Sequence, residues 1–203
     1  MMSEMRVEPS SGKRDFFALY EEEGLLWRMV HKSLYSKMLK DGFQRLDCQE
    51  FKARFLEKEP GYAKVCALQI LSRRSCFEVE LKARLIDKGF CQGSVAEAID
   101  YAKHIGALCD ETRLRSVIEK LIGQGKGKRM ILAYLARYHF DPQAVAECLQ
   151  GLSFNPREEI ARLLQKKIRK LSLQDPVQRR KMVLFLQRKG FGLDDILSVI
   201  HAK

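Results

Sequence analysis

Residues 80–99 read ELKARLIDKGFCQGSVAEAI, and this pattern of apolar residues returns twice further along the chain, at 129–149 and at 180–200. The later copies read RMILAYLARYHFDPQAVAECL and RKMVLFLQRKGFGLDDILSVI, and all three align without gaps on a central phenylalanine. Apolar residues stand five and nine positions before and after it in every copy. The fifteen matched residues are Leu81, Leu85, Phe90, Val95, Ile99, Ile131, Leu135, Phe140, Val145, Leu149, Met182, Leu186, Phe191, Ile196 and Ile200. Such self-similarity at a fixed period identifies an internal repeat.

The spacing within each copy predicts two helices joined by a sharp turn. Apolar residues four apart lie on one face of a helix, and each copy has such a pair on both sides of the phenylalanine. Gly89, His139 and Gly190 stand directly before the phenylalanine, where a residue in the left-handed conformation commonly ends a helix. Because glycine adopts that conformation without strain and histidine tolerates it better than most residues, we assign these three positions to structural turns.

A further helix is expected before each pair, at about 62–73, 111–122 and 156–171. Asn155-Pro156-Arg157-Glu158 offers an N-cap residue, a proline at the first helical position and a glutamate at the third, and Asp110 and Asp141 are further candidate caps. The predicted fold is all-α, with three tandem three-helix repeats in an elongated, curved array. The expected divisions are an N-terminal extension at 1–61 and repeats at 62–109, 110–153 and 154–203.

The N-terminal extension does not carry the repeat. The stretches DFFALY and LLWRMV flank Gly24 and could form a β-hairpin with this glycine in its turn. A short helix is expected over CQEFKARFLEKEP, ended by Pro60 and Gly61. The first residues, up to about Gly12, are expected to be mobile.

The stretch GQGKGKR at 123–129 looks like a loop that wraps a phosphate group, but its spacing fits no nucleotide-binding motif. The P-loop pattern needs a glycine where Lys128 stands, and the GxGxxG pattern lacks its last glycine here. Both motifs also follow a strand, whereas a helix is predicted before this stretch. We therefore interpret it as the turn between the first two helices of repeat 2, with Gly125 and Gly127 allowing a tight reversal and the cations available to an anionic partner.

The chain has a net charge of +11, and all of it arises in the second half. Residues 1–112 hold 18 Lys and Arg against 18 Asp and Glu, whereas residues 113–203 hold 19 against 8. This asymmetry favours an anionic partner, either a nucleic acid or an acidic protein surface. The alternative roles for each cation are a solvated face and stabilisation of a helix C-terminus. The candidate binding residues are Arg73, Arg74, Arg84, Lys88, Lys126, Lys128, Arg129, Arg179, Arg180, Lys181, Arg188 and Lys189.

The sequence contains no recognisable catalytic or metal-binding pattern. Its six cysteines form no C-x-x-C pair and none stands at zinc spacing from a histidine, so we expect small buried thiols in a reducing compartment. No Ser-His-Asp, Cys-His or H-E-x-x-H arrangement is present, and we expect neither enzyme activity nor a cofactor. Without an apolar run of roughly 18 residues or an apolar leader, a cytoplasmic protein that does not enter the membrane is expected.

The aromatic residues at or near apolar repeat positions are expected in the core. They are Tyr62, Phe90, Tyr134, Phe140, Phe185 and Phe191. Stacking on nucleic-acid bases needs exposed aromatic rings among cations, and Tyr138 beside Arg137 is the one candidate for it. Trp27 is expected to pack against the hairpin.

These features together resemble the RecX family of bacterial regulators of the RecA recombinase, and the resemblance extends over residues 62–203. The most specific part lies in repeat 2, in Gly106, Leu108, Asp110, Glu111, the Gly125-x-Gly127 turn and Ile131. Repeat 1 adds Leu71, Arg73, Arg74, Glu80, Leu81, Leu85 and Lys88-Gly89-Phe90. The chain departs from the family pattern at Phe77, where a helix-capping Ser or Thr is usual. It departs again at Cys91 and Gly192, where an acidic residue is common, and at His139, which replaces a glycine.

The resemblance implies a regulatory protein that does no chemistry of its own. It would bind RecA in the groove of the RecA–DNA filament, and single- or double-stranded DNA is a further expected partner. The implied outcome is inhibition of strand exchange and ATP hydrolysis in recombination, repair and the SOS response. We expect a monomer. The alternative is a basic helical protein that binds DNA directly, which predicts steep salt dependence of binding to bare DNA.

Overall fold

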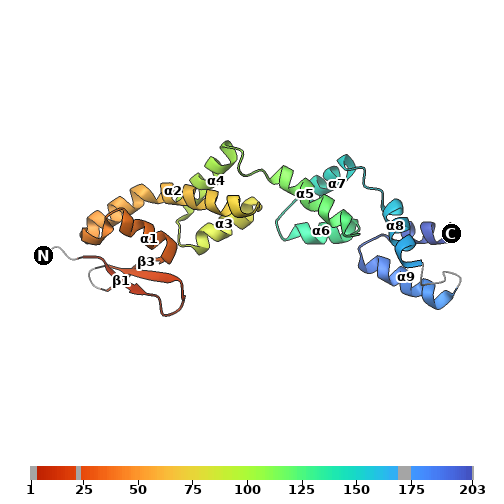
Figure 1. Cartoon of the computed structure of the whole chain (residues 1–203), viewed down its shortest axis with the longest axis horizontal. Coiled ribbons are helices and arrows are strands. Elements are labelled where there is room, and N and C mark those ends of the chain that lie inside the picture. Colours follow the sequence, from red (N-terminus) through yellow and green to blue (C-terminus); the bar gives the residue numbers. More distant parts are fainter. Residues whose placement is uncertain (1–3, 22–23, 169–174, 203) are drawn as a thin grey trace. The chain divides into compact units, whose positions relative to one another are not determined.

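The computed structural model describes residues 4–21, 24–168 and 175–202, and the chain divides into two compact units, Met1–Asp110 and Glu111–Lys203. The first unit contains β1 (Arg6–Pro9), β2 (Phe16–Tyr20), β3 (Leu26–His31), α1 (Lys32–Lys40), the 3-10 helix η1 (Phe43–Arg45), α2 (Cys48–Arg73), α3 (Glu78–Asp87) and α4 (Gln92–His104) (Figure 1). The remaining helices are α5 (Asp110–Gly123), α6 (Lys128–Ala136), α7 (Pro142–Gly151), α8 (Pro156–Ile168), α9 (Pro176–Arg188) and α10 (Leu193–His201). The end predicted for the last leading helix, residue 171, lies outside the described residues.

The predicted β-hairpin is confirmed, and it is part of a three-stranded antiparallel sheet in the order β1-β2-β3. Strand β2 pairs with β3, with Phe16 opposite His31, and Gly24 in the connection has a φ of 76°. The expectation of a mobile N-terminus is wrong for β1, which pairs with β2 along its length and packs Val7 against the core. A four-residue strand that ends in proline carries little signal in the sequence, because its stability comes from its neighbour.

Helix α2 runs straight through Pro60 and Gly61, so the prediction of a short helix ending there is wrong. A proline inside a helix removes one backbone hydrogen bond and costs about 3 kcal/mol. Burial on both sides of the proline offsets this cost, because Phe51 and Phe55 before it and Ala67 after it are at most 3% exposed. The N-terminal extension and the first repeat therefore share one continuous helix.

The sheet packs against α2 through an aromatic contact and a buried ion pair. Trp27 meets Phe55 edge-on with the ring centroids 5.5 Å apart, as expected of a residue that packs the hairpin. Beside it, the Arg28 guanidinium binds both carboxylate oxygens of Glu59, at 2.9 and 3.1 Å. The backbone N–H of Cys91, just before α4, donates to the same carboxylate at 2.7 Å. Because Glu59 is only 1% exposed, these donors must satisfy its charge, and so they tie β3, α2 and α4 together.

The repeat pattern corresponds to the hydrophobic core of both units. Of the fifteen matched apolar residues, only Phe140 is half-buried, and the other fourteen are buried. The turn residues also adopt the predicted left-handed conformation, with φ of 89° at Gly89, 60° at His139 and 91° at Gly190. Of the six aromatic residues expected in the core, Phe90 and Phe191 are buried, whereas the other four are only partly buried.

Helix capping follows the predicted pattern in the second unit and a different one in the first. Asn155 accepts a hydrogen bond from the backbone N–H of Arg157 at 3.1 Å and begins α8 as predicted. Phe77 precedes α3 and has no side-chain acceptor. Two carboxylates act instead, because Glu80 accepts from the N–H of Phe77 at 3.0 Å and Asp110 accepts from the N–H of Glu78 at 2.9 Å. Asp110 lies 32 positions from the helix start that it caps.

The GQGKGKR stretch is the turn between α5 and α6, and it docks on the turn between α9 and α10. The N–H of Gly127 donates to the carbonyl of Lys189 at 2.8 Å, and the N–H of Arg129 donates to that of Gly190 at 3.1 Å. A Cβ atom at Gly127 would lie 2.5 Å from the carbonyl oxygen of Gly190. Gly125 has a φ of 70°. Both glycines are therefore required by the turn itself.

The first unit uses the same kind of docking at its own Lys-Gly turn. The N–H of His31, at the end of β3, donates to the carbonyl of Lys88 at 3.1 Å. A Cβ atom at Gly89 would overlap the carbonyl oxygen of Met29. In both units, then, the Lys-Gly-Phe turn of a repeat offers its lysine carbonyl to a backbone N–H of the preceding segment, and glycine permits the close approach.

Candidate functional site

The structure brings four of the twelve candidate cations together in one pocket of the first unit. The cavity has a volume of about 340 Å³, and we call it the unit-1 pocket. Its lining consists of Ser33, Cys66, Gln69, Ile70, Arg73, Arg74, Arg84 and Lys88.

Three helix ends supply these side chains. Arg73 lies in the last turn of α2 and Arg74 directly follows it. Arg84 lies in the last turn of α3, and Lys88 is the residue that ends this helix. Ser33 is in the first turn of α1, so the pocket also faces the N-terminal, partially positive end of that helix.

His31 connects two sides of the unit-1 pocket. Its backbone N–H donates to the carbonyl of Lys88, and its Nδ1 accepts a hydrogen bond from the N–H of Ser33 at 3.2 Å. Burial, and next to it the positive charge of Lys88, lower the pKa of His31, which favours the neutral ring that can accept this bond. The start of α1 and the end of α3 are thus held in a defined relation by one residue.

The unit-1 pocket is strongly cationic. No carboxylate lines it among the described residues. Arg74 meets Glu80 at 3.8 Å, and in the part of the chain that the structure describes Arg73, Arg84 and Lys88 form no ion pair. Burial raises the pKa of the Cys66 thiol in the pocket wall, although Lys88 acts in the opposite direction. Cys66 is therefore a neutral part of the wall, and the charge of the site comes from the four cations.

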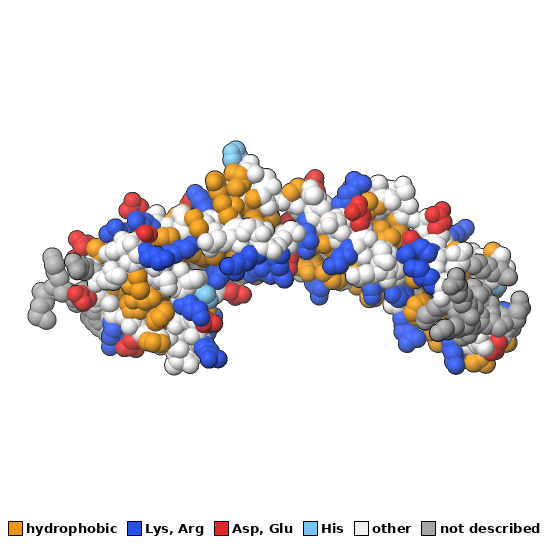
Figure 2. Space-filling view, viewed as in Figure 1, with side chains coloured by type: hydrophobic (Ala, Val, Ile, Leu, Met, Phe, Trp, Pro, Cys, Tyr) orange, Lys and Arg blue, Asp and Glu red, His pale blue; other side chains and the backbone are white. Residues whose placement is uncertain are grey.

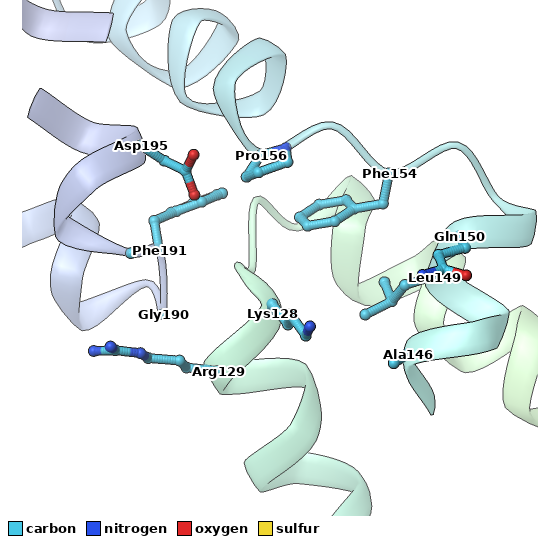
Figure 3. A pocket seen from close by; sticks show the side chains of 11 residues that line it. Lys128, Arg129, Ala146, Leu149, Gln150, Phe154, Pro156, Gly190, Phe191 and Asp195 are labelled. Atoms are coloured by element: carbon cyan, nitrogen blue, oxygen red, sulfur yellow. The ribbon is translucent and has the colours of Figure 1, made fainter. Parts of the chain in front are cut away.

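A second cavity, of about 370 Å³, lies in the second unit beside the docked turns, and we call it the unit-2 pocket. Lys128 and Arg129 line it together with apolar side chains such as Leu149 and Phe154. Figure 3 shows Lys128 pointing toward Leu149, below Phe154, whereas Arg129 extends in the opposite direction, past Gly190. The carboxylate of Asp195 is also in the lining, where Arg157 binds it at 3.3 Å. This pocket has mixed charge and a largely apolar wall.

The other candidate cations do not converge on either pocket. Arg179, Arg180 and Lys181 lie in the first half of α9, and Lys126 is half-buried in the α5–α6 turn. Arg188 donates to the carbonyl of Leu184 in its own helix at 3.3 Å, and Lys189 donates to the carbonyl of Gln124 at 3.1 Å. Both side chains thus contact carbonyl groups near helix ends, the kind of interaction considered above as the alternative to binding.

The stacking candidate Tyr138 is part of a small cluster on α6 and the turn that follows it. The Arg137 guanidinium lies 4.2 Å from the ring centroid of Tyr134 and 5.4 Å from that of Tyr138. A side-chain hydrogen bond with Tyr134 raises the pKa of Arg137, and the interaction with Tyr138 acts in the same direction. A base that stacked on the covered ring faces would have to displace the guanidinium.

Sequence reasoning missed the contribution of the N-terminal extension to the candidate site. His31 and Ser33 follow directly after the hairpin, and nothing in the local sequence distinguishes them from surface residues. Gln69 was also missed, although a residue four positions before Arg73 on a helix shares its face. The four-residue spacing between Gln69 and Arg73 could have indicated that Gln69 lies at the site. Ser33, in contrast, reaches the pocket only because the sheet docks against the helices.

No metal site or disulfide is present among the described residues. They contain no group of three or more His, Cys, Asp or Glu placed to hold a metal ion. None of the six cysteines, all of which lie in the described part of the chain, forms a disulfide, and Cys48, Cys66 and Cys76 are buried as expected. The expectation of burial is wrong for Cys109, which is exposed at the connection between α4 and α5, and Cys91 and Cys148 are half-buried. Among the same residues, no helix is long and apolar enough to cross a membrane.

The fold and the site define a helical-repeat protein in which several cations gather around one pocket. The family model described as "RecX, third three-helix domain" matches residues 157–200. The regulatory protein RecX of Vibrio parahaemolyticus is 30% identical over 139 residues, which cover 66% of this chain and 86% of the relative. The RecX protein of Mycolicibacterium vanbaalenii is 27% identical over 155 residues, covering 72% and 84% of the two chains. The chain belongs to the RecX family of regulatory proteins.

Solved structures agree with this assignment at the level of the fold. A crystal structure of regulatory protein RecX superimposes with a TM-score of 0.63 at 16% identity, over 99% of this chain and 100% of the other. RecX from Lactobacillus salivarius gives a TM-score of 0.62 at 18% identity, over 72% and 97%. The family-model match covers the three helices α8 to α10, although the sequence pattern is most specific in repeat 2.

Proposed function

We infer that this protein binds the RecA recombinase in its filament on DNA and inhibits the recombinase and ATPase activities of that filament. The observation that carries the proposal is membership of the RecX family of regulatory proteins over most of the chain. The protein would act in the cytoplasm as a monomer, without a cofactor and without catalysing a reaction. Its role would belong to DNA recombination and repair.

The cationic residues support this proposal because a DNA filament is a large anionic surface. Lys128 and Arg129 are exposed at the unit-2 pocket, and the docked turns hold their backbone in place. Cations on a fixed backbone lose less conformational entropy on binding than cations on a free loop. The apolar wall of the unit-2 pocket also suits a protein surface better than a phosphate backbone.

The test is a comparison of binding to RecA–ATP–DNA filaments and to bare DNA by fluorescence anisotropy, together with RecA ATPase rates. We expect inhibition of the ATPase at concentrations well below those at which the protein coats bare DNA. The variant Lys126→Gln/Lys128→Gln/Arg129→Gln should bind filaments more weakly. Lys40→Gln/Lys82→Gln/Lys120→Gln is the matched control, because it removes the same charge from exposed residues outside both pockets.

Two results would contradict the proposal. One is the absence of binding to filaments by the unaltered protein. The other is inhibition that appears only when bare DNA is already coated, which would favour the second candidate, a basic protein acting on DNA directly. The net charge of +11 favours this second candidate, because cations attract the phosphate backbone of DNA.

A further inference from the structure

The unit-1 pocket has a composition that the need to stabilise helix ends does not explain. Its four cations sit at the C-terminal ends of α2 and α3, where each interacts favourably with the dipole of its own helix. All four, however, also line one cavity of about 340 Å³. Like charges gathered around one cavity repel one another, and this repulsion opposes the benefit at the helix ends.

An anion bound in the pocket would reverse this balance. No carboxylate is in the described lining, and the carboxylates that act on these cations lie outside it: Glu80 meets Arg74 at 3.8 Å, and Asp15 interacts electrostatically with Lys88. The first turn of α1 adds the positive end of a nine-residue helix, and the Ser33 hydroxyl in the lining is hydrogen-bonded to Nδ1 of His31 at 2.8 Å. Figure 2 shows Lys and Arg side chains in separate groups on the visible face of the first unit. The site thus has the charge, donors and space of a receptor for an anion.

The lining also indicates which anion. The guanidinium groups of Arg73, Arg74 and Arg84 present planar pairs of donors that match the oxygens of a phosphate group. A single carboxylate would leave most of the +4 charge uncompensated, whereas phosphate groups carry more charge and more acceptor oxygens. Cys66 and Ile70 form a small apolar wall, and among the described residues no aromatic side chain lines the cavity on which a base could stack. The pocket therefore fits a phosphate group and, in its described lining, offers no ring for base stacking.

We propose that the unit-1 pocket is a phosphate-binding site that holds phosphate groups through Arg73, Arg84 and Lys88 without stacking on a base. The phosphate groups come from the backbone of a single strand of nucleic acid or from a free nucleotide. The assignment of the site rests on its geometry, and only the link to a filament rests on the proposed function. Under this proposal the cations of the unit-1 pocket bind phosphate groups, and the unit-2 pocket, with its mixed charge and apolar wall, contacts protein.

The experiment measures binding of labelled oligo(dT) to the full chain across a range of salt concentrations. The test variant is Arg73→Gln/Arg84→Gln, and Lys40→Gln/Lys82→Gln is the control of equal net charge. Each phosphate contact on a single strand contributes about −0.7 to the slope of log K against log[salt], which is about fivefold in affinity at 0.1 M salt. We expect the test variant to bind about 25-fold more weakly at 0.1 M salt, with a slope smaller by about 1.4, and the control to change affinity less than twofold.

Competitors distinguish the sources of the phosphate group. Displacement of oligo(dT) by tripolyphosphate or ATP at concentrations that leave the test variant unaffected supports a phosphate site open to free ligands. Resistance to them, with the loss of affinity in the test variant, supports a site for the polymer backbone. Equal weakening of the test and control variants, or displacement by poly-glutamate as effective as by tripolyphosphate, would overturn the proposal.

Fold integrity and the filament assay keep the interpretations separate. Trp27 lies in the same unit as the pocket, so its fluorescence reports whether the test variant is folded. If that variant unfolds, an NMR titration of the unaltered protein with tripolyphosphate tests the site instead. The arginine side-chain N–H signals should shift if phosphate binds in the pocket, and unchanged signals would refute the site. The phosphate site alone is refuted if the unaltered protein binds filaments and the test variant binds oligo(dT) as tightly as the unaltered protein does. Only the proposed function is refuted if the unaltered protein does not bind filaments and the test variant shows the expected loss of affinity for oligo(dT).

Discussion

Replacement of Gly127 by alanine tests whether the GQGKGKR turn is built for docking against the turn between α9 and α10. The φ of Gly127 is −83°, which alanine adopts without strain, so the only obstacle is the new methyl group. It would lie 2.5 Å from the carbonyl oxygen and 2.6 Å from the carbonyl carbon of Gly190, and backbone atoms cannot rotate away as a side chain can.

The size of the effect follows from the cheaper of two ways to relieve this overlap. If the turns separate, the hydrogen bonds from the N–H groups of Gly127 and Arg129 are lost, at about 0.5–1.5 kcal/mol each. If they stay together, the overpacking costs about 1–3 kcal/mol. We therefore expect Gly127→Ala to lower the free energy of unfolding of the second unit by about 2 kcal/mol.

Gly123→Ala is the matched control in the same stretch. Gly123 is the last residue of α5, and a Cβ atom there would meet nothing within 4 Å. Alanine has the higher helix propensity, so this variant should be more stable by about 0.5 kcal/mol. The two substitutions add the same methyl group four residues apart and are expected to act in opposite directions.

Urea unfolding monitored by two signals locates the effect. Far-UV circular dichroism follows the helices of both units, whereas the fluorescence of Trp27, the only tryptophan, follows the first unit. With an m-value of about 1–2 kcal/mol/M, Gly127→Ala should move part of the dichroism transition by about 1–2 M urea and leave the Trp27 transition in place. An unchanged dichroism transition, or an equal shift of both signals, would refute the docking argument.

Four further substitutions, at three positions, test the first unit. Pro60→Ala restores a backbone hydrogen bond of α2 and should stabilise the unit by about 1–2 kcal/mol in Trp27-monitored urea unfolding, and a loss of stability would show that the proline is adapted to its site. Asp110→Ala removes the cap of α3 and should cost about 0.5–2 kcal/mol. Asp110→Asn keeps an acceptor oxygen and, because burial raises the pKa of Asp110, should be at least as stable as wild type at pH 7. The lowered pKa of His31, which faces Lys88, Asp15 and Lys32, means that the folded state binds fewer protons than the unfolded state. Wild type should therefore lose stability relative to His31→Asn as the pH falls below about 6.5, and parallel pH profiles would contradict this reasoning.

The repeat could be recognised from the sequence because its information is local. Leu81, Leu85 and their counterparts recur at helical spacing, and each helix must bury that face whatever its neighbours are. The turns were equally predictable, since positive φ restricts Gly89 and Gly190 to glycine in practice. His139 shows that the position, rather than the residue type, carries the requirement.

Elements whose stability comes from distant partners could not be recognised in this way. Strand β1 forms because β2 offers it a ladder of hydrogen bonds. Helix α2 continues through Pro60 because the sheet covers Phe51 and Phe55 and helix α4 covers the other end, which no rule about proline can anticipate. The cap of α3 comes from Asp110, 32 positions further along the chain. The effect of having Phe77 in place of Ser or Thr could therefore not be inferred from the local sequence.

The candidate site, too, has features that could be predicted from the sequence and features that depend on the fold. The helical repeat, its turns, the excess of cations and the resemblance to the RecX family could all be recognised without coordinates, because periodicity and composition do not depend on long-range contacts. Which cations meet, in contrast, depends on how the helices pack. Arg73 and Arg84 share a cavity because the end of α3 lies beside the last turns of α2, and Ser33 joins them because His31 binds the turn at Lys88. The physical reason is that a binding site needs several charges within one Debye length of each other, and chain folding, rather than sequence spacing, sets those distances.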